Sequence, residues 1–316
     1  KKKLLQAAAG SAGGAGLDVD EVFSTYLYDG TGSAQTITNG IDLAGEGGIV
    51  WLKDRGDTTP HTIHTTDIGA LNYLVPHYIS GNNAGSAGYG LTAFNSDGFS
   101  LGIDYEGENG SGDDYVSWTF RKAPKFFDIV TWTGDGTTGR SISHSLNSPV
   151  GMIIAKKTSG SGQWSVLHRS VAISGSPAEG LGRLNLTNAF NGYSSGFNEE
   201  FPSSTAFKVS HVAGASSQTL NTSGENYVAY LFAHNDGDGE FGPDADQDVI
   251  KCGSYTGNSN STGPEINLGF EPQWLMIKRT SNTGGWFVID TMRGWTNGST
   301  NDPFLRADSN QQEYEN

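Results

Sequence analysis

Cysteine, positive charge and long apolar runs are all scarce in this sequence. Its one cysteine, Cys252, cannot build an internal disulfide framework, so folding does not depend on an oxidising compartment. A membrane-spanning helix needs about 20 consecutive apolar residues, and no run in the chain approaches that length. We therefore expect no membrane insertion.

Basic residues are outnumbered by acidic ones. The chain has 19 Lys and Arg against 34 Asp and Glu, which gives a formal net charge of −15. An acidic chain is repelled by phosphate backbones and by anionic membranes. This balance predicts that the protein has no nucleic-acid partner.

Helical periodicity is also rare. The chain contains 45 Gly, and Gly, Asn and Ser interrupt its apolar stretches every few residues. Many short strands joined by tight turns produce this pattern, so we predict an all-β protein. Aromatic residues make up 11% of the chain in regularly spaced clusters, which argues against disorder.

One pattern occurs three times, over Tyr28–Lys53, Trp132–Lys156 and Tyr255–Lys278. Each copy opens with an aromatic residue and a Gly-rich turn. It continues through a short alternating strand and a Gly or Pro break into an apolar strand that ends in Lys. Such self-similarity predicts tandem modules, which we interpret as jelly-roll β-sandwiches.

The second half of the module also recurs. His61, Trp164 and Trp286 occupy one position, and Tyr73–Leu74, Arg183–Leu184 and Phe304–Leu305 are expected to match. Closing strands over 115–120 and 227–232 carry large apolar residues on both faces, which is typical of a strand buried between two layers. The third copy has no such strand, so we expect the natural polypeptide to continue past Asn316 and module three to be incomplete here.

The repeat divides the chain into five parts. The predicted parts are an Ala- and Gly-rich attachment segment at 1–22, β-sandwich modules at 23–123 and 124–235, an acidic linker at 236–248, and the first part of a third module at 249–316. Near the start of the chain, the apolar run LLQAAA is too short for a secretion signal.

Three groups of residues suggest chemistry, and each has a plainer interpretation. His61, His64 and His77 suggest a metal site, but His61 and His64 lie at strand packing positions, which favours neutral buried histidines. The Asp236–Asp248 linker resembles a calcium loop but has Phe241 where the EF-hand pattern needs Gly. A calcium ion there therefore stays an alternative to a solvated linker.

Paired carboxylates and exposed aromatic residues form the last two groups. A glycosidase pair is conceivable in one Gly-rich loop, although an exposed turn explains the same acidic residues: Asp104, Glu106, Glu108, Asp113 and Asp114. Aromatic rings also bind sugars by stacking. Trp164 and Trp286 recur in the repeat, which favours the core, whereas Trp295 and Tyr193 are the weak candidates for a ligand-binding surface. We predict no catalytic, cofactor or metal residue.

Several long phrases resemble virion structural proteins of marine tailed phages, especially cyanophages, which carry tandem concanavalin A-like repeats. These phrases are GIDLAGEGGIVWLKDR at 40–55, NSDGFSLG at 95–102, RLNLTNAF at 183–190, NYVAYLFAHN at 226–235, and KCGSYTGN with GFEPQWLMIKR at 251–279. The similarity covers nearly the whole chain, including the leader. It implies no catalytic residues.

The resemblance implies a tail fibre or another tail-attached appendage, assembled in the host cytoplasm and located in the virion. It further implies a homotrimer that binds other tail proteins through residues 1–22. Modules in a stalk would then present a distal region to a host glycan or outer-membrane protein. The alternatives are a tailspike-like polysaccharide depolymerase and a capsid-surface decoration or fibre.

Overall fold

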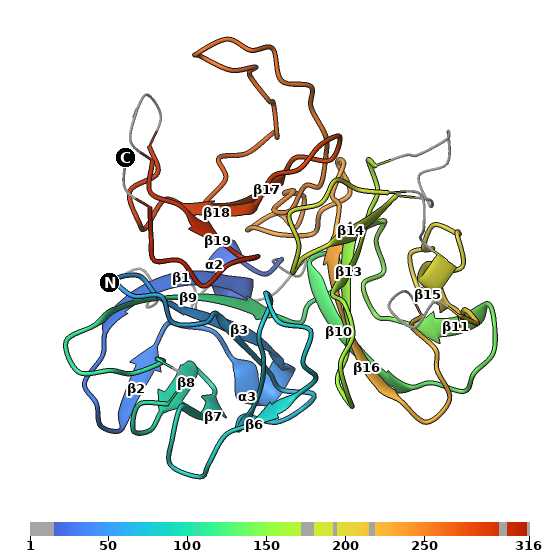
Figure 1. Ribbon diagram of the computed structural model, residues 1–316. Coiled ribbons are helices and arrows are strands. Elements are labelled where there is room, and N and C mark those ends of the chain that lie inside the picture. The colour runs from blue at the N-terminus through green and yellow to red at the C-terminus, as the bar shows by residue number, and fades with distance from the viewer. Residues whose placement is uncertain are drawn as a thin grey trace.

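The computed structural model describes residues 16–105, 107–171, 180–191, 195–214, 219–296 and 302–314. The all-β prediction is confirmed, because the described chain consists mainly of antiparallel sheets (Figure 1). Its helical elements are short: α2 (Val19–Val22), α3 (Leu43–Glu46) and the 3-10 helix η2 (Ser195–Phe197).

Residues 23–121 form a sandwich of two sheets. The larger sheet has the order β1 (Phe23–Asp29), β9 (Asp114–Arg121), β3 (Gly48–Asp54), β4 (Thr62–Thr65), β5 (Asn72–Leu74), β6 (Asn83–Ala84). The smaller has the order β2 (Gln35–Thr38), β8 (Gly98–Leu101), β7 (Leu91–Asn95). An apolar core that includes Val50, Leu52 and Phe99 lies between the two sheets.

Residues 127–233 repeat this plan. The larger sheet has the order β10 (Phe127–Thr133), β16 (Asn226–Ala233), β12 (Val150–Lys157), β13 (Ser165–His168), β14 (Leu181–Arg183). The smaller sheet pairs β11 (Arg140–Ser143) with β15 (Ala206–Val209). Its own core includes Ile153, Leu231 and Phe207.

The third module is reduced to one sheet in the described chain. Its order is β17 (Trp274–Lys278), β18 (Trp286–Asp290), β19 (Leu305–Arg306). Residues 251–273, which contain the opening of the third repeat, form no strand there, so the expected alternating strand is wrong. The physical reason is the absence of a partner, since β1 and β10 form against β9 and β16, and no described strand takes that place beside β17.

The continuous apolar runs of β3 and β12 reflect burial on both faces. In β3, Val50 and Leu52 point into the module's own sandwich, while Ile49 and Trp51 point into a second, shared core. Strands β9 and β16 are buried in the same two-sided way, as their sequences predicted.

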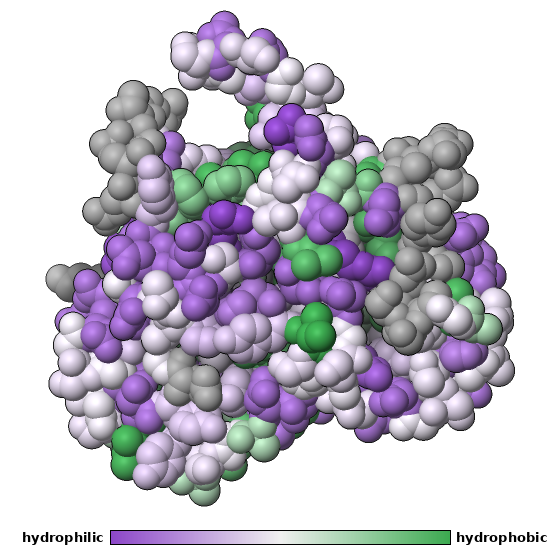
Figure 2. All heavy atoms as spheres, viewed as in Figure 1, coloured by the Kyte–Doolittle hydropathy of each residue, from purple (hydrophilic) through white to green (hydrophobic). Residues whose placement is uncertain are grey.

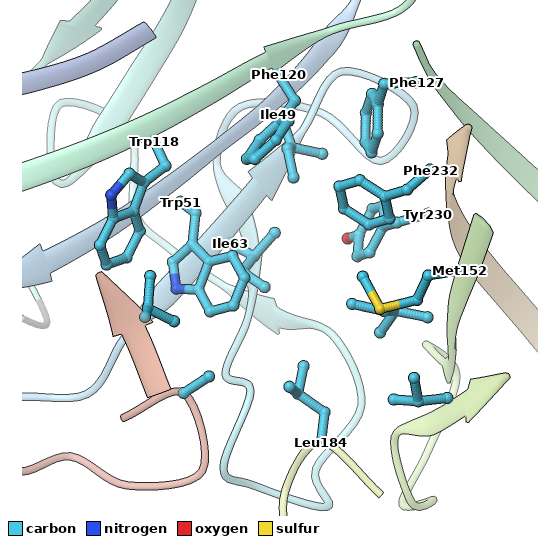
Figure 3. Packing of buried hydrophobic residues seen from close by; sticks show 14 of the residues in the cluster. Ile49, Trp51, Ile63, Trp118, Phe120, Phe127, Met152, Leu184, Tyr230 and Phe232 are labelled. Carbon is cyan, nitrogen blue, oxygen red and sulfur yellow. The ribbon is translucent and has the colours of Figure 1, made fainter. Parts of the chain in front are cut away.

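The shared core joins all three modules. In Figure 3, Trp51, Trp118 and Phe120 from module one face Phe127 and Phe232 from module two. Val288 and Leu305 add the contribution of module three. The expected stalk of modules in a row is therefore wrong, because the three large sheets pack around a common apolar centre (Figure 1).

Equivalent backbone hydrogen bonds close the modules into a ring. The Asn82 N–H donates to the Thr158 carbonyl at 2.8 Å, and the Phe190 N–H donates to Thr280 at 3.0 Å. The Glu313 N–H then donates to the Arg55 carbonyl at 2.8 Å, which connects module three back to module one. Thr158, Thr280 and Arg55 each lie two positions after the lysine that ends the repeat, so the three joints use equivalent acceptor positions.

A lysine and a tryptophan strengthen the first two joints. Buried Lys156 donates from Nζ to the Ile79 carbonyl at 2.8 Å, and Trp164 donates from Nε1 to the Val75 carbonyl at 3.1 Å. At the second joint, the Lys278 Nζ and the Trp286 Nε1 donate to Thr187 and Arg183 at 3.1 Å and 2.8 Å. The repeated lysine and tryptophan therefore hold the preceding module.

The third joint is built differently. His61 takes the position of the tryptophan, and the backbone of Arg306 in module three contacts its ring. In addition, Arg293 of module three is fully buried and bonds Asp290 at 2.6 Å and Glu313 at 2.9 Å. Its guanidinium lies 5.3 Å from the ring centre of Trp118, whose Nε1 donates to the same Asp290 at 2.9 Å. This joint depends on paired charges rather than on repeated residues.

Strand register corrects one expected match between modules. Leu74 lies opposite Ile63, and Leu305 lies opposite the equivalent Val288. In module two the residue opposite Val166 is Gly182, so the expected match of Leu184 to Leu74 is wrong. The connection between β13 and β14 is longer than that between β4 and β5, which accounts for the shifted match.

Replacing Arg293 by Met is expected to lower the free energy of unfolding by about 3–5 kcal/mol, because buried Asp290 loses its charge partner and Glu313 keeps only Arg55. Urea unfolding at neutral pH measures this loss. The control is Arg279→Met, because Arg279 is exposed and its substitution is expected to cost less than about 0.5 kcal/mol. Equal stability of the two variants would show that the charged joint does not hold the ring.

The Lys156 joint predicts a dependence of stability on pH. Burial lowers the pKa of Lys156 from 10.5 to about 7. Between these values the unfolded chain binds a proton that the folded chain lacks, so stability rises with pH, by at most about 1.4 kcal/mol per pH unit. Lys156→Met is expected to show a shallower rise in unfolding free energy between about pH 7.5 and 9.5. Exposed Lys208→Met is the control, and an identical slope in both variants would contradict the prediction.

Candidate functional site

A large groove lies where module three meets module one. It encloses about 910 Å³ and combines aromatic, amide and charged side chains. It is lined by Arg55, Gly56, Thr58, Asp114, Phe287, Phe304, Arg306, Gln311, Gln312, Glu313 and Tyr314. Its volume falls within the usual range for small-molecule sites. Because two modules line it, the groove exists only when the ring is closed.

An aromatic ladder forms one wall of the groove. Phe287 of β18 packs edge-on against Phe304, with ring centres 5.1 Å apart, and Phe304 packs against Tyr314 at 4.9 Å. Reciprocal backbone bonds between Phe304 and Tyr314, at 3.2 Å and 3.0 Å, fix the last ring in place. Tyr314 is 50% exposed, so part of its side chain faces solvent at the groove.

Polar groups surround this ladder. Thr58, Asp114, Gln311 and Gln312 are all exposed at the groove. Their hydroxyl, carboxylate and amide groups can donate to and accept from the hydroxyls of a sugar, while the rings pack against its apolar face. The chemistry of the groove therefore fits a carbohydrate.

Glu313 in the groove is already paired. Its carboxylate accepts from Arg55 Nη2 at 2.7 Å and from Arg293 Nη1 at 2.9 Å. Two guanidinium groups hold this carboxylate in a fixed position. Its role in the groove is consequently to hold the two modules together.

A family model matches residues 18–316 and is described as a domain of unknown function, DUF7483. The chain belongs to the DUF7483 family. The match spans all three modules and both sides of the groove. No curated protein and no solved structure matches the chain.

Trp295, one of the two aromatic residues singled out by sequence, does not line the groove of the DUF7483 chain. Trp295 is half-buried in the turn after β18, and its backbone N–H donates to the Asp290 carbonyl at 3.2 Å. Tyr193 lies outside the described residues. Trp164 and Trp286, in contrast, are buried as the repeat predicted.

Of the three module-one histidines, His64 lies in β4, His61 directly precedes that strand, and His77 lies in a turn after β5. His61 is buried, and its Nδ1 accepts from Trp51 Nε1 at 3.0 Å. Burial also lowers its pKa well below the usual value, as the neutral packing role predicted. His77 has a pKa lowered to about 4, first by burial and then by Lys53. Among described residues, no three His, Cys, Asp or Glu side chains gather to hold a metal.

The proposed carboxylate pairs have structural partners. Glu108 is 2% exposed, bonds His64 Nε2 at 2.7 Å and accepts from the Leu91 N–H at 2.8 Å. Asp104 accepts from the Glu108 N–H at 3.0 Å and so closes its own turn. Glu106 lies outside the described residues. Asp113 and Asp114 are exposed, and Asp114 alone of this set reaches the groove.

The acidic 236–248 segment is a folded loop. Phe241 inserts into the shared core, and the carboxylate of Asp248 accepts from the N–H groups of Gly237 and Gly239 at 2.8 Å and 3.0 Å. The loop also pairs with the leader, because the Gly242 N–H donates to the Leu17 carbonyl at 2.9 Å. Calcium binding in this segment stays a prediction.

Most of the predicted attachment segment, residues 1–15, lies outside the described residues. Val22 at the end of the segment is buried in the shared core.

No helix in the described ranges is long and apolar enough to cross a bilayer.

The sequence alone does not indicate the groove. Phe304 was interpreted only as a repeat residue, and Tyr314 lies in the polar stretch SNQQEYEN. A lone aromatic residue beside two glutamines in that stretch is the one available signal. Its partners Arg55 and Thr58 are far away in the sequence, and only ring closure brings them near.

Proposed function

We propose that the DUF7483 chain is a structural and adhesive protein of a tailed-phage virion, a tail fibre or tail-attached appendage. The groove between modules one and three binds a host surface glycan. The observation that carries the adhesive role is the aromatic ladder of Phe287, Phe304 and Tyr314, bordered by exposed amides. The phage assignment rests on the sequence resemblance.

The groove favours binding over hydrolysis. Glycoside hydrolysis generally uses two carboxylates on either side of the scissile bond, one of them a general acid. Of the two acidic residues that line the groove, Glu313 is fixed by Arg55 and Arg293, which leaves Asp114 as the exposed carboxylate. A single available carboxylate supports adhesion without turnover.

A closed ring suits adhesion under mechanical load. The three modules share one apolar core, so a pulling force is distributed over all three joints. Each groove binds weakly, and a homotrimer that carries three grooves gains strength by multivalency. In this proposal residues 1–22 attach the protein to other tail proteins, and the protein is assembled in the host cytoplasm.

Two alternative functions make different predictions. A tailspike-like depolymerase would release reducing ends from host polysaccharide, and this activity would depend on Asp114. A capsid-surface decoration or fibre would label the head of the virion with antibodies against this chain, whereas a tail appendage labels the tail. Electron microscopy of immunolabelled virions separates head from tail.

Tyr314→Ala is expected to weaken binding of purified host-envelope polysaccharide about tenfold, because it removes the exposed stacking face. Isothermal titration calorimetry measures the affinity. Tyr255→Ala is the matched control, because Tyr255 is similarly exposed, at 52%, but lies outside the groove. Equal binding by both variants, or polysaccharide cleavage by the wild-type chain, would overturn the adhesive groove.

A further inference from the structure

Module two contains a small polar pocket, in a molecule whose surface is mainly hydrophilic in the view of Figure 2. The pocket encloses about 220 Å³. Sites for drug-sized ligands usually enclose roughly 300–1,000 Å³, so this pocket is limited to about one sugar-sized ring. It shares no residue with the groove between modules three and one.

The pocket lies at one end of the larger sheet of module two. Lys157 ends β12, Ser165 begins β13, and Tyr227 is the second residue of β16. Lys157 lies opposite Tyr227, and Ser165 lies opposite Ala155, which belongs to the core of this module. Because side chains alternate along a strand, all of these residues share the inner face of the sheet. The segment 219–222 forms the other wall of the pocket.

Module one has a buried acid in the equivalent place. The Tyr28 hydroxyl donates to the Glu108 carbonyl at 2.8 Å, and the Trp132 Nε1 donates to the Leu220 carbonyl at 2.9 Å. Tyr28 and Trp132 open the first two copies of the repeat, so Glu108 and Leu220 are equivalent. The Glu108 carboxylate accepts from the N–H of Leu91 at 2.8 Å, whereas Leu220 lines the pocket with an apolar side chain. Module two therefore lacks the negative charge of its counterpart.

Positive charge exceeds negative charge around the pocket. Arg183 lies opposite Ser165, is half-buried, and donates from Nη1 to the Ser165 Oγ at 2.7 Å. Burial lowers the pKa of Arg183 to about 10, so its guanidinium stays charged at neutral pH. Among the described residues Arg183 has no carboxylate partner, whereas Lys157 pairs with Glu225 at 3.4 Å. A half-buried charge without a counter-ion is costly, and an anionic ligand group would offset that cost.

Two buried hydroxyl groups can donate into the pocket. Ser165 is 2% exposed and Tyr227 is 1% exposed. The oxygen of each already accepts one hydrogen bond, from Arg183 at 2.7 Å and from the Thr222 N–H at 3.1 Å. Each hydroxyl keeps its own proton for an acceptor on a ligand. The bond from the Arg183 cation polarises the Ser165 hydroxyl and makes it a stronger donor.

We propose that this pocket binds a sugar acid, a hydroxylated ring that carries one carboxylate. The hydroxyls of Ser165 and Tyr227 donate to the carboxylate, whose charge balances the excess of positive charge. Glu225 accepts from ring hydroxyls at the mouth of the pocket, and Leu220 packs against the ring carbons. A neutral sugar lacks the anionic acceptor that this arrangement favours. The site is separate from the adhesive groove and does not depend on it.

Titration of the full 316-residue chain with glucuronate, followed by amide NMR shifts, tests the proposal. Shifts are expected at residues 162–165 and 219–227. Glucose is expected to bind about tenfold more weakly because it lacks the carboxylate, and acetate about tenfold more weakly because it lacks the ring. The proposal is wrong if glucuronate causes no shifts or shifts other residues, or if glucose or acetate binds as tightly.

Ser165→Ala is expected to weaken glucuronate binding about tenfold, because the carboxylate loses a charge-assisted hydrogen bond. Ser148→Ala is the matched control, because Ser148 is 1% exposed in the same module but lies outside the pocket. Equal affinity of these two variants would contradict the assigned role of Ser165.

Tyr227→Phe provides a second test that removes only a hydroxyl group. It is expected to weaken glucuronate binding about tenfold, whereas Tyr230→Phe, at a fully buried position of β16 outside the pocket, is expected to leave it unchanged. Tyr314→Ala is also expected to leave it unchanged, because Tyr314 lies in the groove. Loss of glucuronate binding in Tyr314→Ala would place the sugar acid in the groove and overturn the pocket.

Discussion

The need to cover both faces of each large sheet is the constraint on which this structure depends. Strands β3, β9, β12 and β16 carry apolar side chains on both faces, so a single sandwich leaves half of each strand exposed. The second face is buried only because three sheets meet around the shared core. Burial at roughly 25 cal/mol per Å² of apolar area makes that core the main stabilising term. The sequence therefore divides into repeated modules, but one shared core stabilises all three modules together.

The joints show two ways of closing such a ring. Lysine and tryptophan at repeated positions hold the carbonyls of the preceding module at two joints. At the joint that returns to module one, a buried network of Arg293, Asp290 and Glu313 contacts Trp118 and Arg55 of module one. This difference gives the molecule one distinct joint out of three, and the aromatic groove lies at that joint. In the proposed adhesive role, the joint between modules three and one provides the binding surface, whereas the other two joints are structural contacts.

The third module, which has one sheet in the described chain, gives the ring a second distinct feature. The same repeat that forms a buried strand in β3 and β12 leaves β17 half-exposed, and Tyr255, the counterpart of buried Tyr28 and Trp132, is 52% exposed. Sequence pattern alone does not make a strand when the hydrogen-bond partner is missing.

The sequence by itself determined the all-β class, the threefold repeat, the two-sided burial of the closing strands and the core positions of Trp164 and Trp286, because periodicity and recurrence are local properties. It also predicted a packing role for His61. Tertiary structure alone decided that the modules form a ring and not a stalk, and that Gly182 takes the position expected for Leu184. The groove depends on contacts between Arg55 and Glu313, which no local pattern encodes. Such contacts arise only when distant segments close on one another, and this is why Tyr314, and not Trp295, is found at the candidate site.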